Sequence, residues 1–128
     1  MKIVSLIARV LLGLLYGFFG LNGFLHFIPM HPMPPGFAAE FTGALIQSHY
    51  MSVVFLFELI PGALLLLNQY VPLALTLLGP VIVNIVLFHA FMAPAGLPGA
   101  IVISILWFLA AHRVRSAFAG LFQRRVPA

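Results

Sequence analysis

Four long apolar stretches, separated by short polar or proline-containing segments, dominate the pattern of this chain. Each is close to the length of about 20 residues that a helix needs to cross a bilayer. The connections Asn68–Pro72 and 93–98 are so short that they make neighbouring helices antiparallel. The pattern therefore predicts an all-α fold, an integral membrane four-helix bundle in which residues 1–128 form a single transmembrane domain. The expected spans are about 3–28, 49–67, 71–92 and 97–118.

The only long connection follows the first span. Its first part, Pro29–Gly36, is too rich in proline to be helical. In the second part, 37–47, Phe37, Phe41 and Leu45 recur at four-residue spacing, which predicts a short amphipathic helix in the first external loop. Such a helix either lies in the outer interface and covers the bundle or is only a connector, and the pattern leaves both open.

The composition supports membrane insertion and excludes several classes of function. The chain is 63% hydrophobic and 6% charged, with a mean hydropathy of +1.18, which is more apolar surface than a soluble domain of 128 residues can bury. Nucleic acid is not an expected partner, because the basic residues are few and do not cluster along a surface. The absence of cysteine excludes thiol–disulfide exchange, thiolate metal sites and iron–sulfur clusters.

The basic residues also predict the topology. Lys2 precedes the first span, and Arg113, Arg115, Arg124 and Arg125 lie at or after the end of the fourth. The connections on the opposite side carry no Lys or Arg. By the positive-inside rule, both termini are expected in the cytoplasm, with membrane lipids as the first partners.

Two charged residues interrupt the apolar stretches far from other charges, Arg9 in the first span and Glu58 in the second. A charge at the bilayer centre costs roughly 2.5–3.5 kcal/mol on insertion scales, so it usually has a partner, a proton or a function. With the helices aligned by their expected ends, the two residues differ in depth by about 6 Å at 1.5 Å per residue. We therefore expect a direct or water-bridged pair. Alternatively, Arg9 extends to the headgroups, and Glu58 pairs with Asn84 or is protonated.

Two asparagines are expected at a depth similar to that of Glu58. Asn22 lies on the first helix, and Asn84 lies one turn after Pro80, which bends the third helix. These residues predict a polar layer inside the bundle, which would either bind a ligand or only link the helices by hydrogen bonds. Together with Arg9, the layer is the predicted ligand-binding polar core. No catalytic motif is present, so no catalytic residue is assigned.

Histidines gather at the outer side of the predicted bundle and form a second candidate site. Imidazole is a common ligand of metals and haem. No element carries histidines at metal-ligand spacing, however, so we expect neither a metal nor haem, and an ordinary interfacial role is the alternative. The residues of this site are His26, His49 and His89, with His31 in the loop.

Three segments carry a family resemblance. They are Arg9-Val-Leu-Leu-Gly13 leading into Phe19-Gly20-Leu21-Asn22, Glu58-Leu-Ile-Pro-Gly62 before a leucine run, and Val71-Pro72 through Pro80-Val-Ile-Val-Asn84 to Phe88-His89. With the four-helix plan and the long first external loop, they make the chain similar to the DoxX family of small bacterial membrane proteins, from Arg9 to about Trp107. Family members often carry Lys where this chain has Gly23, so any role of that Lys is absent or replaced here.

The resemblance implies a multi-pass protein of the bacterial cytoplasmic (inner) membrane, and some family members are linked to quinone-coupled oxidation of sulfur compounds. Our leading hypothesis is an accessory subunit that binds a small hydrophobic molecule or a partner protein within the bundle. A quinone-linked membrane oxidoreductase subunit, with a redox protein as partner, is the alternative. An oligomeric transporter is a further alternative, because four helices are few for alternating access.

Overall fold

The computed structural model describes all 128 residues, and all of its regular elements are helices. The prediction of an all-α fold with four long apolar helices is confirmed, since four helices are long and apolar enough to cross a membrane. The main helices are α1 (Lys2–Leu25), α2 (Phe37–Gln47), α3 (Tyr50–Leu67), α4 (Val71–Phe91) and α5 (Leu97–Arg113). A 3₁₀ turn (Pro94–Gly96) precedes α5, and α6 (Arg115–Phe118) and a second 3₁₀ turn (Ala119–Phe122) follow it.

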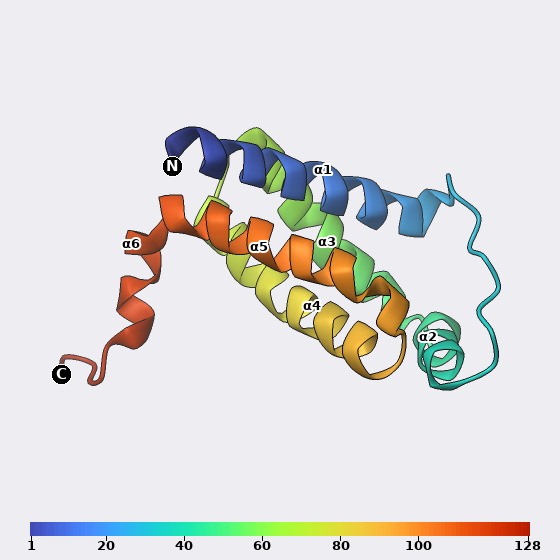
Figure 1. The fold of residues 1–128 in the computed structure, drawn as a ribbon. Coiled ribbons are helices and arrows are strands. Elements are labelled where there is room, and N and C mark those ends of the chain that lie inside the picture. Colours follow the sequence, from blue (N-terminus) through green and yellow to red (C-terminus); the bar gives the residue numbers. More distant parts are fainter.

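Two helix ends differ from the predicted spans by several residues, and three others differ by a single residue. α1 ends at Leu25 because His26 takes a left-handed conformation, with a φ of 55°. His49 takes the same conformation before α3, with a φ of 63°, so that helix begins one residue later than expected. A left-handed residue ends a helix because the regular hydrogen-bond ladder does not continue through it. α5 ends at Arg113, where Val114 breaks the helix and α6 leaves its axis (Figure 1).

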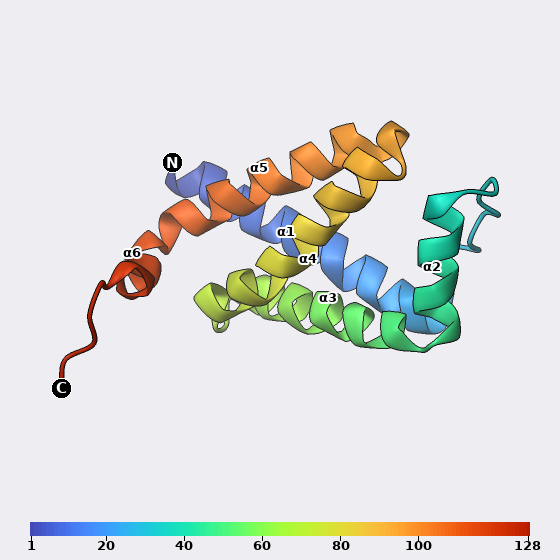
Figure 2. The ribbon, with the colours of Figure 1, turned by 90° about the horizontal axis from the view of Figure 1, so that it is seen from below.

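The four long helices form a bundle in which α1 and α4 each contact both α3 and α5. Figure 1 shows the N-terminus and the α5–α6 junction at one end of the bundle, and α2 with its preceding loop at the other. We call these ends the termini end and the loop end. α2 lies across the loop end against α3 (Figure 2), and the ring of Phe41 lies 5.8 Å from that of Phe88 on α4. The amphipathic helix predicted at 37–47 is therefore packed onto the bundle.

The hydrophobic core is concentrated towards the termini end. Leu12, Leu65, Leu75 and Leu78 have 0% of their surface exposed, and with neighbouring alanines of α5 they connect all four long helices. Tyr16 is the member of this core that lies nearest the loop end on α1. Towards the loop end the bundle is more open, and Figure 2 shows α3 and α5 diverging there.

α1 and α3 pack through glycines, in a contact that we call the glycine seam. A Cβ added to Gly62 would lie 2.4 Å from the nitrogen of Gly17, and one added to Gly20 would lie 2.6 Å from the nitrogen of Leu59. Because backbone atoms occupy these places, only glycine permits the contact. The seam also sets the antiparallel register, in which Gly17 lies opposite Gly62 and Gly20 lies opposite Leu59.

Candidate functional site

Arg9 lies beside the end of α3 and not deep between the helices. Its guanidinium donates a hydrogen bond to the backbone carbonyl of Leu65. Leu65 is in the last turn of α3, and its carbonyl also accepts a long backbone hydrogen bond of 3.3 Å from the N–H of Asn68. A carbonyl oxygen has two lone pairs, so Arg9 can use the second one. A cation at this place also interacts favourably with the negative end of the helix dipole. Arg9 therefore caps α3.

The predicted pair between Arg9 and Glu58 is not formed. The register of the glycine seam places Glu58 level with Leu21 of α1. Arg9 lies a further twelve positions back along α1, which is about 18 Å at 1.5 Å per residue, too far for its side chain. The expected gap was too small because it assumed that the helices begin and end together. α1 has 24 residues and α3 has 18, and the seam leaves the first turns of α1 extending past α3.

Glu58 is buried in the middle of α3 without a hydrogen-bond partner. Its residue is 8% exposed and lies on the buried face of the helix, together with Pro61, Gly62 and Leu65. None of the side-chain hydrogen bonds in the molecule involves its carboxyl group. Backbone N–H groups in the middle of a helix are already engaged, so they offer no donor. A buried polar group without a partner is rare in a folded protein and marks a candidate site.

Tyr16 is a functional candidate that the sequence reasoning missed. The residue is 3% exposed, and its hydroxyl is buried without a hydrogen-bond partner. By the register of the glycine seam, Tyr16 lies five positions along α1 from the level of Glu58, which is about 7.5 Å at 1.5 Å per residue. We call Glu58 and Tyr16 the acid–phenol pair. The available signal was a tyrosine in the middle of an apolar span, whereas tyrosines of membrane helices favour the interfaces.

The two asparagines do not join Glu58. Asn22 lies near the predicted level, but its side-chain oxygen accepts a hydrogen bond from the N–H of Ile28 at 2.8 Å and so holds the chain that follows α1. Asn84 is exposed, and its side-chain nitrogen donates to the carbonyl of Pro80 at 2.8 Å. The predicted polar layer is therefore absent, because each amide is satisfied within its own helix or the adjoining loop.

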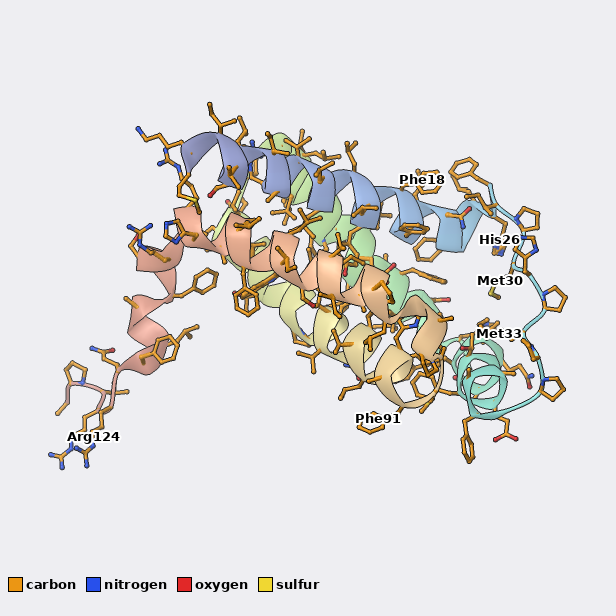
Figure 3. All side chains as sticks on the ribbon, in the orientation of Figure 1. Phe18, His26, Met30, Met33, Phe91 and Arg124 are labelled. Atoms are coloured by element: carbon orange, nitrogen blue, oxygen red, sulfur yellow. The ribbon has the colours of Figure 1, made fainter.

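The histidines of the second candidate site do not converge. His26 and His49 are exposed at the ends of α1 and α3, and Figure 3 shows His26 at the start of the loop after α1. The Nδ1 atom of His89 lies 3.0 Å from the carbonyl oxygen of Ala93, within the α4–α5 connection. No three His, Asp or Glu side chains come together in a way that could hold a metal ion.

An open apolar groove of about 460 Å³ lies between α4 and α5. Its lining includes Val83, Ser104 and Trp107. The hydroxyl of Ser104 already donates to the carbonyl of Ala100 at 2.8 Å, and the indole N–H of Trp107 donates to the carbonyl of Leu75 at 2.8 Å. The groove therefore offers apolar contact but no free hydrogen-bonding group.

Comparison of the chain with models of known protein families, with curated proteins and with solved structures found no match. The DoxX resemblance therefore stays a prediction. At Gly23, where family members often have Lys, a Cβ would lie 2.3 Å from the ring of Phe55. A longer side chain there would require the Phe55 ring to move.

Proposed function

We propose that the protein is a multi-pass membrane protein that binds a small hydrophobic molecule within its bundle, with Glu58 and Tyr16 as the polar contacts. The observation that carries the proposal is the acid–phenol pair. The hydroxyl of Tyr16 is fully buried without a partner, and the carboxyl group of Glu58, a residue that is 8% exposed, makes no hydrogen bond. An unsatisfied buried group costs about 1–3 kcal/mol, and a ligand that hydrogen-bonds to it removes that cost. The large apolar side chains exposed along the four long helices support a lipid environment.

The pair favours a ligand that has a polar head on a hydrocarbon body. A phenol hydroxyl donates a hydrogen bond, and a carboxyl group donates when protonated and accepts when ionised. The carbonyl oxygens of a quinone are matching acceptors. In this proposal the protein is an accessory subunit, which holds the molecule for a partner membrane or redox protein.

A quinone-linked oxidoreductase subunit is the second candidate, and the position of Glu58 favours it. Reduction of a quinone to a quinol takes up two electrons and two protons. A redox partner would supply the electrons, and a buried carboxyl group beside the quinone could pass on protons. The accessory role needs only binding, so quinol formation by the protein together with its partner separates the two candidates.

We further propose the inner-membrane topology with both termini in the cytoplasm, because Lys2, Arg113 and Arg115 gather at the termini end. A reporter fused after Ala128 is then active only if it is a cytoplasmic reporter. Activity of a periplasmic reporter at this position would contradict the topology and place the loop end inside.

The binding proposal is tested with a short-chain benzoquinone and the purified full-length protein in detergent. Trp107 is the only tryptophan, so quenching of its fluorescence reports binding. We expect Glu58→Leu and Tyr16→Phe each to weaken binding about tenfold, since each removes one hydrogen bond worth about 1–1.5 kcal/mol. The matched controls are Glu40→Leu and Tyr50→Phe, which alter exposed residues of the same types and should leave binding unchanged.

The α4–α5 groove provides the competing location. Val83→Phe adds a ring to the groove wall and should not affect binding at the acid–phenol pair. If Val83→Phe weakens binding while Glu58→Leu and Tyr16→Phe do not, the ligand lies in the groove and the proposed site is wrong. Absence of binding by the unmodified protein would contradict quinone as the ligand.

A further inference from the structure

A second pocket opens at the termini end, and none of its lining residues belongs to the acid–phenol pair. It has a volume of about 380 Å³ and lies between the first turns of α1, the α3–α4 turn and the last turn of α5. Its charged and polar lining consists of Lys2, Ser5, Arg9, Asn68 and Arg113. Residues from three separate parts of the chain therefore build one polar site.

The charge of this pocket is not compensated. Lys2, Arg9 and Arg113 contribute three cations, and no acidic residue lines the pocket. The chain has only two acidic residues, of which Glu40 lies on α2 at the loop end and Glu58 lies in the middle of α3. Arg9 uses one N–H donor on the Leu65 carbonyl, and a guanidinium has five in all. The uncompensated positive charge and the free N–H donors of the pocket therefore favour binding of an anion.

Ser5 provides an independent indication of a ligand. The residue lines the pocket and is 2% exposed, and its hydroxyl is buried without a hydrogen-bond partner. A serine in a helix usually satisfies its hydroxyl on a backbone carbonyl of the preceding turn, as Ser104 does on Ala100. The unused hydroxyl of Ser5 can therefore donate to an oxygen atom of a bound group.

The remaining lining is apolar and includes Ile3, Leu6 and Val114. A site with cations on one part and aliphatic side chains on another matches a molecule with an anionic head and hydrocarbon chains. Arginine binds phosphate oxygens through paired, charge-assisted hydrogen bonds. Basic pockets between membrane helices near the bilayer surface are known binding places for anionic lipid headgroups.

We propose that this pocket binds the headgroup phosphate of an anionic phospholipid. Lys2, Arg9 and Arg113 neutralise the phosphate, the hydroxyl of Ser5 donates to one of its oxygens, and the acyl chains follow the aliphatic wall into the surrounding bilayer. The site uses none of the residues of the acid–phenol pair, so a failed test of one proposal does not affect the other.

The test measures lipid binding to the delipidated full-length protein by native mass spectrometry. Phosphatidylglycerol and phosphatidylcholine with identical acyl chains are compared, because they differ in net headgroup charge. We expect tighter binding of phosphatidylglycerol and a loss of about fivefold in its affinity for Arg113→Gln, which removes one basic residue near the headgroup. Arg113 is exposed and makes no side-chain hydrogen bond, so this variant should fold, whereas a variant of Arg9 would lose the cap of α3.

Arg124→Gln is the matched control, because Arg124 lies in the tail and outside the pocket (Figure 3). It should leave the affinity for phosphatidylglycerol unchanged, while Ser5→Ala should lower it without any change in net charge. Equal losses in Arg124→Gln and Arg113→Gln, or no loss in Ser5→Ala, would show a diffuse surface attraction and overturn the proposal. Displacement of phosphatidylglycerol by excess inorganic phosphate, with phosphate itself bound more weakly by Arg113→Gln, would identify a site for free anions instead.

Discussion

Arg9 and Glu58 are both isolated charges in apolar helices, but their surroundings differ. Arg9 lies at a helix end, where the carbonyl of Leu65 accepts its hydrogen bond. Glu58 lies in the middle of α3, where it is 8% exposed and has no partner. Whether each charge finds a partner depends on its position along the bundle. Its distance in sequence from other charges does not decide this.

The backbone explains why the two positions are not equivalent. The last turn of a helix offers a cation carbonyl oxygens with weak or missing backbone partners, whereas the middle of a helix offers no free N–H to a carboxylate. A lone basic residue within reach of a helix C-terminus can thus be purely structural. A lone acid in mid-helix can be satisfied only by another side chain, a proton or a ligand, which makes Glu58 the stronger functional candidate.

Gly62→Val should have the largest effect on stability. The glycine seam sets the positions of Arg9 and Glu58 along the bundle, so this variant tests the comparison directly. The new Cβ would meet the backbone nitrogen of Gly17 at 2.4 Å, so α1 and α3 must move apart. We expect a loss of about 3 kcal/mol, at the upper end for overpacking, measured as thermal unfolding in detergent. Gly79→Ala is the control, since the nearest atom, on Trp107, is 4.0 Å away, and it should be neutral or slightly stabilising. Equal effects of the two variants would contradict the register.

Arg9→Met should have the next largest effect. It keeps an apolar stem but removes the charge-assisted hydrogen bond to the Leu65 carbonyl, which is worth about 1.5–3 kcal/mol. The same unfolding measurement should show no loss beyond about 0.5 kcal/mol for Arg124→Met in the exposed tail. If Arg9→Met were as harmless as this control, its side chain would extend freely to the headgroups.

Glu58→Leu should change stability in the opposite direction. It replaces a buried group that lacks a partner by an apolar one of similar size, and we expect a gain of about 1–2 kcal/mol. Together with lost benzoquinone binding, this gain would show a site that is maintained for function at the expense of stability. Glu40→Leu, in exposed surroundings on α2, should show neither change. A loss of stability in Glu58→Leu would reveal a partner within the protein.

The smallest expected effect is the coupling between the two charges. At a separation of about 18 Å along the bundle, the effects of Arg9→Met and Glu58→Leu should add to within about 0.3–0.5 kcal/mol in the double variant. A double-mutant cycle measured by thermal unfolding gives this number directly. Coupling well above that range would mean that the two side chains act as a pair after all.

The hydropathy pattern was sufficient to predict the helices, because membrane length and the four-residue period of 37–47 are local properties. The register between helices was not predictable in the same way, since it depends on backbone contacts at Gly17 and Gly62. The glycine spacing in α1 does indicate close packing. It does not indicate which helix is the partner or which residues of the two helices lie opposite each other.

The sequence also did not allow a prediction of which way the polar face of α4 points, into the bundle or outward. Thr76, Pro80 and Asn84 share one face of α4, and that face is exposed and not turned into the bundle. Thr76 and Asn84 donate to the carbonyls four positions earlier, each at 2.8 Å. Because they are satisfied on their own helix, they gain nothing from burial, and so the usual expectation that polar residues of a membrane helix face inward does not hold here.

The glycine seam also bears on the order in which the molecule is assembled. During synthesis α1 leaves the ribosome before its close partner α3, which follows only after the proline-rich loop and α2. The small residues of α1 therefore have no partner helix until α3 is made, whereas α3 and α4 can associate as soon as the short turn between them is complete. Lengthening the loop after Pro29 should delay the joining of α1 to α3 while leaving the α3–α4 hairpin unaffected.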